Sequence, residues 1–198
     1  MSNQFWQDGR PQNGLTWEEF QEHFEIEAHT PPDESPNPGQ TRYSPLNWKR
    51  SERVEKTYKM SDEARSAMLA ITTPQLWMVI TEGWCGDSAQ SFPIIHRLAN
   101  VNPLVEIRVI LRDENLDILD AYLTDGKRGI PKLVAFNRDG EELFTWGPRP
   151  REAAELFRDG LAEGTPKSQV YEKLHLWYAR DRGKAIEREF TELVRSSA

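Results

Sequence analysis

The pattern of apolar and polar positions in the middle of the chain predicts alternating strands and helices. Residues 76–80 form an uninterrupted apolar run, which is typical of a strand buried on both faces. Residues 105–111 are the next strand candidate, and residues 88–100 between them carry apolar side chains at helical spacing. The pattern therefore predicts a strand, helix, strand unit with a parallel pair of strands.

The segment that follows predicts an antiparallel addition to this pair. A second helix is expected over residues 116–123, where it is closed by an Asp-Gly pair. Residues 132–136 and 142–146 flank the turn sequence Asn-Arg-Asp-Gly-Glu and predict a hairpin. The expected fold class is therefore α/β, with a mixed sheet flanked by helices, an N-terminal extension and a C-terminal helix.

The N-terminal part of the chain predicts helices around a proline-rich stretch. Residues 15–28 place aromatic side chains at spacings of three and four, which suits one helical face that docks on the main domain. Residues 30–39 carry four prolines, which disfavour helix and sheet and indicate a linker or a wrapping arm. Residues 47–59 are strongly charged and partly helical, and a serine N-cap opens a further helix over residues 61–71.

Two amphipathic helical regions, residues 151–158 and 168–194, complete the predicted elements. The length of 198 residues suits one domain of ordinary size with extensions. We therefore expect an N-terminal extension with a proline-rich linker over residues 1–60, a main domain over 61–160 and a C-terminal helical extension over 161–198.

Charge and composition exclude several partners. The net charge of −7 gives no electrostatic footprint for nucleic acid or for an anionic membrane. The first residues lack a basic segment followed by an apolar core, and no apolar run approaches the length that spans a bilayer. The expectation is a cytoplasmic protein that needs no cofactor, and the sequence leaves its oligomeric state open.

Cys85 is the single cysteine, so neither an intrachain disulfide nor a multi-cysteine metal site can form. A lone cysteine is ordinarily an inert core residue, but this one lies between a predicted buried strand and a predicted helix. The positive end of that helix favours a thiolate, so a pKa below the ordinary value is expected. Gly86 leaves room for the backbone of a partner, and Ser88 offers a hydroxyl where a second thiol would stand.

The histidines do not predict a base or a metal site. His96 follows Cys85 by eleven residues, about 16 Å along a helix axis, so it is expected to be a surface or packing residue. His23, His29 and His175 are scattered and lack the paired spacing of a metal site.

Several separated features resemble the thioredoxin superfamily. Residues 84–88, Trp-Cys-Gly-Asp-Ser, are similar to its Trp-Cys-Gly-x-Cys centre with serine in place of the second cysteine. Pro93 falls where thioredoxins kink the active-site helix, and residues 129–131, Gly-Ile-Pro, match the loop that carries a cis-proline. The resemblance covers residues 61–160, about half of the chain, and implies that this segment is a thioredoxin-like domain with the thioredoxin-like fold. A CxxS string by itself would be weak support.

This resemblance implies a site and also a departure from ordinary dithiol chemistry. Ser88 cannot resolve a mixed disulfide, and Val79 occupies the position where family members often hold a buried carboxylate. Asp87 is expected to raise the pKa of Cys85 by charge repulsion, which opposes the helix dipole. The expected site residues are Cys85 and Ser88 for catalysis and Trp84, Gly86, Asp87, Ile130 and Pro131 for substrate binding.

Two functions remain open at the level of the sequence. The first is a monothiol thiol-disulfide oxidoreductase, which attacks a disulfide-containing protein or a low-molecular-weight thiol adduct, such as one with glutathione, and is released by an external thiol. The second is a redox-inactive binding or interaction protein on the same scaffold. A third, a transferase that activates a bound thiol, is disfavoured because the C-terminal segment is short for its extra helical domain.

Overall fold

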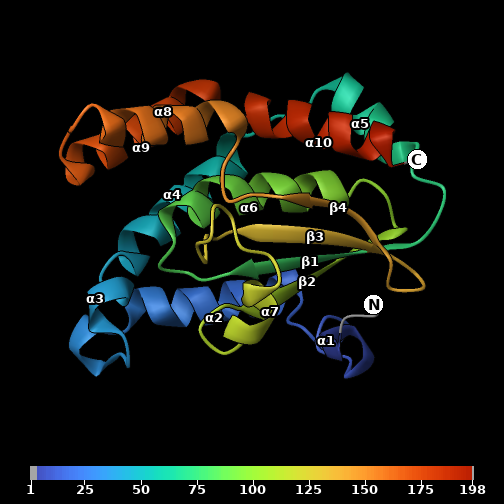
Figure 1. The fold of residues 1–198 in the computed structure, drawn as a ribbon, viewed down its shortest axis with the longest axis horizontal. Helices are drawn as coiled ribbons and strands as arrows, with labels where there is room; N and C mark the ends of the chain where they lie inside the picture. The colour runs from blue at the N-terminus through green and yellow to red at the C-terminus, as the bar shows by residue number, and fades with distance from the viewer. Residues whose placement is uncertain (1–3, 198) are drawn as a thin grey trace.

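The computed structural model describes residues 4–197 and has helices on both sides of one four-stranded sheet (Figure 1). In chain order its elements are α1 (Gln4–Gln7), α2 (Trp17–His29), η1 (Pro32–Glu34), α3 (Pro38–Thr41), α4 (Ser44–Thr57), α5 (Asp62–Leu69), β1 (Gln75–Thr81), α6 (Gly86–Ala99), β2 (Val105–Leu111), α7 (Leu116–Asp120), β3 (Lys132–Asn137), β4 (Glu142–Trp146), α8 (Arg151–Ala162), α9 (Lys167–Asp181) and α10 (Lys184–Ser196).

The sheet has the strand order β2-β1-β3-β4, with β1 parallel to β2 and antiparallel to β3. Val79 of the central strand is paired with Val109 on one side and with Leu133 on the other. The hairpin of β3 and β4 is antiparallel, so the sheet is mixed and the predicted α/β class is confirmed. The central position of β1 explains its unbroken apolar run, because both of its faces are covered.

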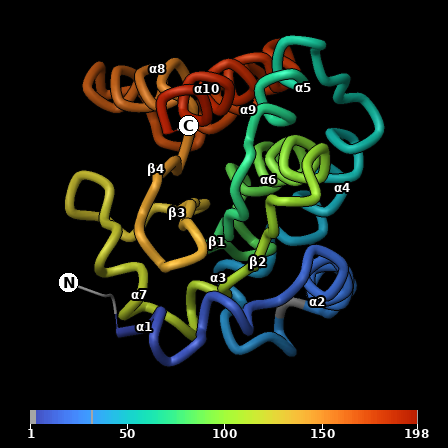
Figure 2. Tube along the Cα trace, turned by 90° about the vertical axis from the view of Figure 1, so that its right-hand side faces the viewer, coloured from blue at the N-terminus to red at the C-terminus, as the bar shows by residue number. Residues whose placement is uncertain are grey.

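Alternate side chains of the strands supply two hydrophobic clusters on opposite faces of the sheet. Trp77 and Val79 pack with α2, α4, α5, α6 and α10 on one face, while Met78 and Ile80 pack with α1 and α7 on the other. Figures 1 and 2 show α8, α9 and α10 on the α6 side of the sheet and α1 and α7 on the opposite side. The helix α6, which follows Cys85, therefore lies on the face of the sheet that the C-terminal helices also cover.

The N-terminal segment docks as its aromatic pattern predicts. Thr16 and Glu19 form a capping box that opens α2, and Phe20 and Phe24 are buried against the central layer. The preceding Leu15 is extended rather than helical, because its backbone exchanges two hydrogen bonds with Val109 at the edge of β2. The proline-rich stretch is not devoid of helix: it holds the one-turn elements η1 and α3.

Two predicted helices differ from the structure. The helix expected over residues 116–123 is shorter, since α7 ends at Asp120. The region 168–194 is broken into α9 and α10 at Arg182 and Gly183, which both have positive φ. Glycine adopts this conformation at Gly183 at little cost, and a Cβ there would lie only 2.6 Å from Ile94 Cδ1. The sequence analysis missed this C-terminal glycine signal.

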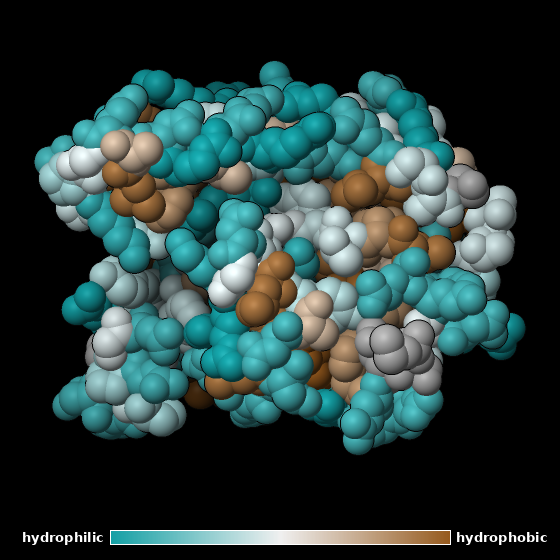
Figure 3. Space-filling model, in the orientation of Figure 1, coloured by the Kyte–Doolittle hydropathy of each residue, from teal (hydrophilic) through white to brown (hydrophobic). Residues whose placement is uncertain are grey.

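The C-terminal helices pack against the sheet layer and against each other. Leu174 and Tyr178 of α9 join Ala153 of α8 in a third small cluster, while α10 packs on α5 and α6. On the face drawn in Figure 3, hydrophilic side chains predominate and apolar ones form separate patches. No helix within residues 4–197 is both long and apolar enough to cross a membrane. The predicted division at residues 60 and 160 stays a prediction.

Candidate functional site

Cys85 lies where the central strand gives way to α6. It is the N-cap residue of that helix, with φ of −84° and ψ of 116°, and Pro93 lies farther along inside the same helix. Its Sγ donates a hydrogen bond to the carbonyl oxygen of Ile130 at 3.3 Å. The side chain is 8% exposed and packs in the cluster that includes Ile80 and Ile130. The sulfur is therefore held between the helix end and the 130–131 loop.

The loop opposite the sulfur has the backbone that the resemblance implies. The peptide bond between Ile130 and Pro131 is cis, and both residues are buried. Gly147 at the end of β4 has a φ of 111°, and a Cβ there would lie 2.1 Å from the carbonyl oxygen of Pro131. Glycine at this position thus lets β4 approach the loop that faces Cys85.

The environment of Cys85 opposes ionisation, contrary to the sequence-based expectation. Burial, followed by repulsion from Asp87, raises the pKa of the Cys85 thiol to about 11. Hydrogen bonds from Ser88 and from the backbone amides of residues 87 and 88 lower this pKa, which is the expected helix-end effect. The prediction of a depressed pKa was wrong because desolvation of a nearly buried sulfur outweighs the helix end.

Ser88 is a buried structural partner as well as a neighbour of the thiol. Thr81 Oγ1 donates a hydrogen bond to Ser88 Oγ at 2.6 Å, which links the end of β1 to the first turn of α6. Val79 is fully buried among apolar side chains. Because valine has no titratable group, this position cannot relay a proton to or from Cys85.

Asp87 is the centre of a buried charge network. Its Oδ2 accepts a hydrogen bond from Arg149 Nε at 2.9 Å and pairs with Arg149 Nη2 at 2.7 Å. Its Oδ1 accepts a hydrogen bond from Tyr178 of α9 at 2.9 Å. The side chain is 6% exposed, and burial raises its pKa, an effect that Arg149 opposes. Asp87 thus joins α6 to the C-terminal helices.

The remaining predicted substrate-binding residues, Trp84 and Gly86, lie on either side of the cysteine. Gly86 is covered by α9, because a Cβ there would lie 2.9 Å from His175 Cε1. Trp84 is partly exposed, with the Arg112 guanidinium 5.3 Å from its ring centroid. Its carbonyl oxygen accepts a hydrogen bond from Asn47 of α4 at 2.8 Å. Helices outside the strand-helix-strand unit therefore fix the site loop.

Sequence reasoning missed the partners that the C-terminal half supplies. Tyr178 lies within the amphipathic region predicted over residues 168–194, and that pattern did not indicate that its hydroxyl group donates to a buried acid. Arg149 and His175 carried no local signal, since their proximity to α6 depends on how α8 and α9 pack. His96 is a packing residue as predicted: its ring stacks on Trp17 with centroids 4.1 Å apart.

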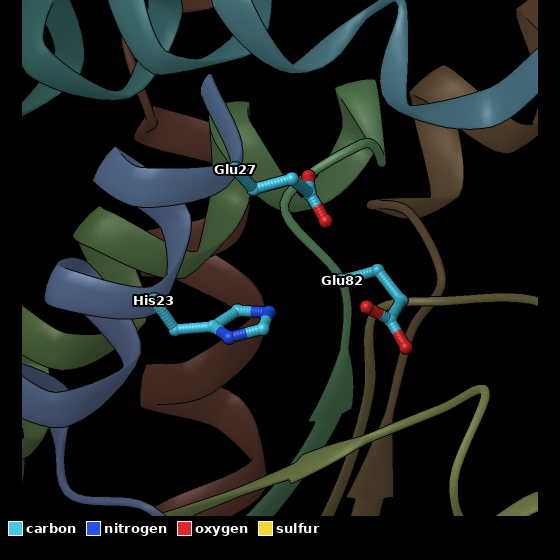
Figure 4. Close-up of side chains that lie close together, drawn as sticks. All are labelled: His23, Glu27 and Glu82. Carbon is cyan, nitrogen blue, oxygen red and sulfur yellow. The ribbon is translucent and has the colours of Figure 1, made fainter. Parts of the chain in front are cut away.

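A second titratable cluster lies on the other side of the 82–85 loop, formed by His23, Glu27 and Glu82 (Figure 4). Their potential ligand atoms all lie within 4.8 Å of one another. Burial raises the pKa of Glu82 to about 7 and also raises the pKa of Glu27. Gly83 permits this approach, because a Cβ there would lie 2.7 Å from Glu27 Oε1.

All three residues border a cavity of about 270 Å³, which Trp84 also lines. The cluster was not predicted from the sequence, because its single histidine lacks the paired spacing of a metal site. The spacing of four residues between His23 and Glu27 on α2 was the available signal, since it places both side chains on one helical face.

Comparison with known proteins supports the fold and identifies the family. An HIV epitope-scaffold superposes with a TM-score of 0.63 at 14% identity, over 95% of this chain and 96% of the scaffold. A protein of unknown function from Pseudomonas aeruginosa superposes with a TM-score of 0.55 at 16% identity, over 87% of this chain and 95% of that one. No curated protein matches the sequence. A family model described as thioredoxin matches residues 35–163, and because this segment is more than half of the chain, the protein belongs to that thioredoxin family.

Proposed function

We propose that the protein is a monothiol thiol-disulfide oxidoreductase that acts through Cys85. The observation that carries this proposal is the position of Cys85 Sγ, 3.3 Å from the carbonyl oxygen of Ile130 and at the N-cap of α6. An extended partner segment that pairs with the backbone at Ile130 brings its disulfide to this sulfur. Trp84, Gly86, Asp87 and Pro131 complete the proposed substrate-binding surface.

The proposed reaction is two successive exchanges. The Cys85 thiolate attacks one sulfur of a mixed disulfide, such as a glutathionylated protein, forming a disulfide with the glutathione sulfur and expelling the protein thiolate. A second glutathione thiolate then attacks the Cys85 adduct, which releases glutathione disulfide and restores the Cys85 thiolate. The external thiol is the reductant, and the released thiolates take up protons from water.

The residues around the sulfur have different roles in the proposed reaction. Ser88 forms no disulfide; its hydrogen bond to Cys85 favours the thiolate, while Thr81 holds its hydroxyl in place. The raised pKa of Cys85 keeps the resting thiol protonated at neutral pH, so exchange is slow there and accelerates as the pH rises. A partner that displaces the hydrogen bond to Ile130 has access to the sulfur.

Reduction of a glutathionylated peptide by glutathione, with and without the protein, tests this proposal. We expect turnover and a glutathione adduct on Cys85 detectable by mass spectrometry, both lost in Cys85→Ser. Ser88→Ala is the matched variant: it is expected to keep turnover, because no step uses a second thiol, but at a lower rate, because the hydrogen bond that favours the thiolate is lost. Equal turnover by Cys85→Ser, or failure of the wild type to form the adduct, contradicts the proposal.

A redox-inactive binding protein is the second candidate. The low exposure and raised pKa of Cys85 favour this alternative, because both slow attack by the sulfur. It predicts that Cys85 reacts with iodoacetamide no faster than free cysteine at any pH and that a partner binds Cys85→Ser as tightly as the wild type. Catalysed reduction of the glutathionylated peptide excludes it.

A further inference from the structure

We propose that His23, Glu27 and Glu82 form a binding site for a divalent transition metal ion, with Zn²⁺ as the ion that suits their donors. Imidazole nitrogen and carboxylate oxygen are both ligands of Zn²⁺, whereas Ca²⁺ prefers oxygen ligands alone. This site is separate from the thiol chemistry and does not depend on the proposed function.

The fold brings the three side chains together from two elements. His23 and Glu27 lie one turn apart on α2, and Glu82 directly follows the end of β1 (Figure 4). All three donor atoms lie within 4.8 Å of one another, whereas ligands about 2.0–2.2 Å from Zn²⁺ lie about 3.5 Å apart in a tetrahedron. Ion binding therefore requires the donor atoms to approach one another by about 1 Å.

Glu82 itself points to a ligand beyond the protein. It is 5% exposed, and its Oε1 accepts a hydrogen bond from the Asp113 amide at 2.8 Å. Its Oε2 receives no hydrogen bond from residues 4–197. This side chain borders the cavity that it shares with His23 and Glu27, so the oxygen is open to a ligand in that space. An ion bound there can coordinate it.

The charges around the cluster favour a cation as that partner. Within the described part of the chain, neither Glu27 nor Glu82 forms an ion pair with lysine or arginine. Arg112, the nearby cation, pairs with Asp113 at 3.0 Å. Two nearby carboxylates in a partly buried site repel each other unless a proton or a metal ion lies between them.

The donors that remain free suit a metal with an open coordination position. Glu27 Oε1 accepts a hydrogen bond from Ser44 Oγ at 2.5 Å, which fixes the carboxylate and leaves its second oxygen for the ion. The ring nitrogens of His23 form no hydrogen bond with residues 4–197, so the imidazole is available. Three protein ligands beside a cavity of about 270 Å³ leave a fourth position for water.

Titration of the 198-residue chain with Zn²⁺ by calorimetry tests the site. We expect saturable binding of one ion, with an affinity reduced at least about tenfold in His23→Ala and in Glu82→Gln because each loses a ligand. His29→Ala is the matched control: His29 lies on the same helix, is exposed and interacts with the backbone of Glu25. Its affinity for Zn²⁺ is expected to equal that of the wild type.

Substitution of Co²⁺ for Zn²⁺ supplies a second readout. We expect visible absorption from a site with nitrogen and oxygen ligands, unchanged in Cys85→Ser because the thiol is not a ligand. Circular dichroism spectra of all variants establish that they are folded. Absence of saturable Zn²⁺ binding below about 1 mM overturns the proposal, as does wild-type affinity in folded His23→Ala or loss of binding in Cys85→Ser.

Discussion

Two buried acids, Asp87 and Glu82, lie on either side of Cys85 and differ in how their burial is compensated. Asp87 receives the Arg149 guanidinium and the Tyr178 hydroxyl from the C-terminal half of the chain. Glu82 faces a second carboxylate and an imidazole, and one backbone amide donates to it. This difference in bonding partners shows that two acids close together in the sequence can have different roles.

The partners that offset the burial of each carboxylate also determine how that carboxylate affects the surrounding residues. The hydrogen bonds of Asp87 are all made within the protein and connect α6 to α9. The charge of Asp87 also raises the pKa of the adjacent Cys85 thiol. The Glu82 cluster opens on a cavity and retains an unpaired oxygen. We therefore expect substitutions in the first to disturb stability and thiol reactivity, and substitutions in the second to affect mainly metal binding.

Removal of Arg149 is expected to have the largest effect. Arg149→Ala leaves Asp87 buried without its ion pair, which costs about 3 kcal/mol of the free energy of unfolding. Urea denaturation measures this loss. Arg151→Ala is the control, because Arg151 is exposed and its pairing contributes less than about 1 kcal/mol. Similar losses in both variants contradict the idea of a closed network at Asp87.

Asp87→Asn is expected to change thiol reactivity by about tenfold. Loss of the negative charge lowers the pKa of Cys85 by about one unit, which raises the iodoacetamide reaction rate at pH 8 accordingly. In the wild type the rate is expected to increase with pH toward a midpoint near about 11. The exposed Asp159→Asn is the control, and identical pH profiles in the wild type and Asp87→Asn refute the proposed repulsion.

Glu82→Gln is expected to have the opposite effect on stability to Arg149→Ala. With metal removed by a chelator, the variant gains about 1 kcal/mol in the free energy of unfolding, because a buried carboxylate without a cationic partner becomes a neutral amide. The amide oxygen can still accept the hydrogen bond from Asp113. Urea denaturation beside the exposed Glu22→Gln measures the gain, and a loss of stability would show that Glu82 is already compensated.

His175→Ala is expected to produce the smallest change, about a threefold faster alkylation of Cys85 through greater access. The His175 imidazole covers Gly86, and burial lowers its pKa to about 4, so it is neutral near pH 7. The rate should therefore increase without a shift of the pH profile. Leu176→Ala, on an exposed position of the same helix, should leave the rate unchanged. A shifted profile indicates an electrostatic role instead.

The fold was largely predictable because its strongest signals are local. The run at the centre of β1, the full extent of β2 and the hairpin at β3 and β4 follow from apolar runs and turn residues. The joint at Gly183 was missed because the amphipathic pattern continues across it. The short α7 was overestimated because its apolar pattern extends beyond Asp120.

The candidate site was predictable in its position and not in its electrostatics. The place of Cys85 before α6, opposite the loop at Pro131, follows from the sequence and its family resemblance. Its raised pKa does not, since the sign depends on how much water the apolar cluster around the sulfur excludes. The hydrogen bonds at the helix end lower the pKa of Cys85, but by less than burial raises it.

The α/β pattern, the single thiol and the absence of a resolving cysteine can be read from the sequence, because they depend on residue identity and local spacing. Three contacts depend instead on the folded chain: Arg149 compensates Asp87, His175 covers Gly86 and Glu82 lies beside His23. These contacts join segments that are distant in the chain. Burial and charge depend on such distant neighbours, so the packing of the whole chain sets the chemistry on each side of Cys85.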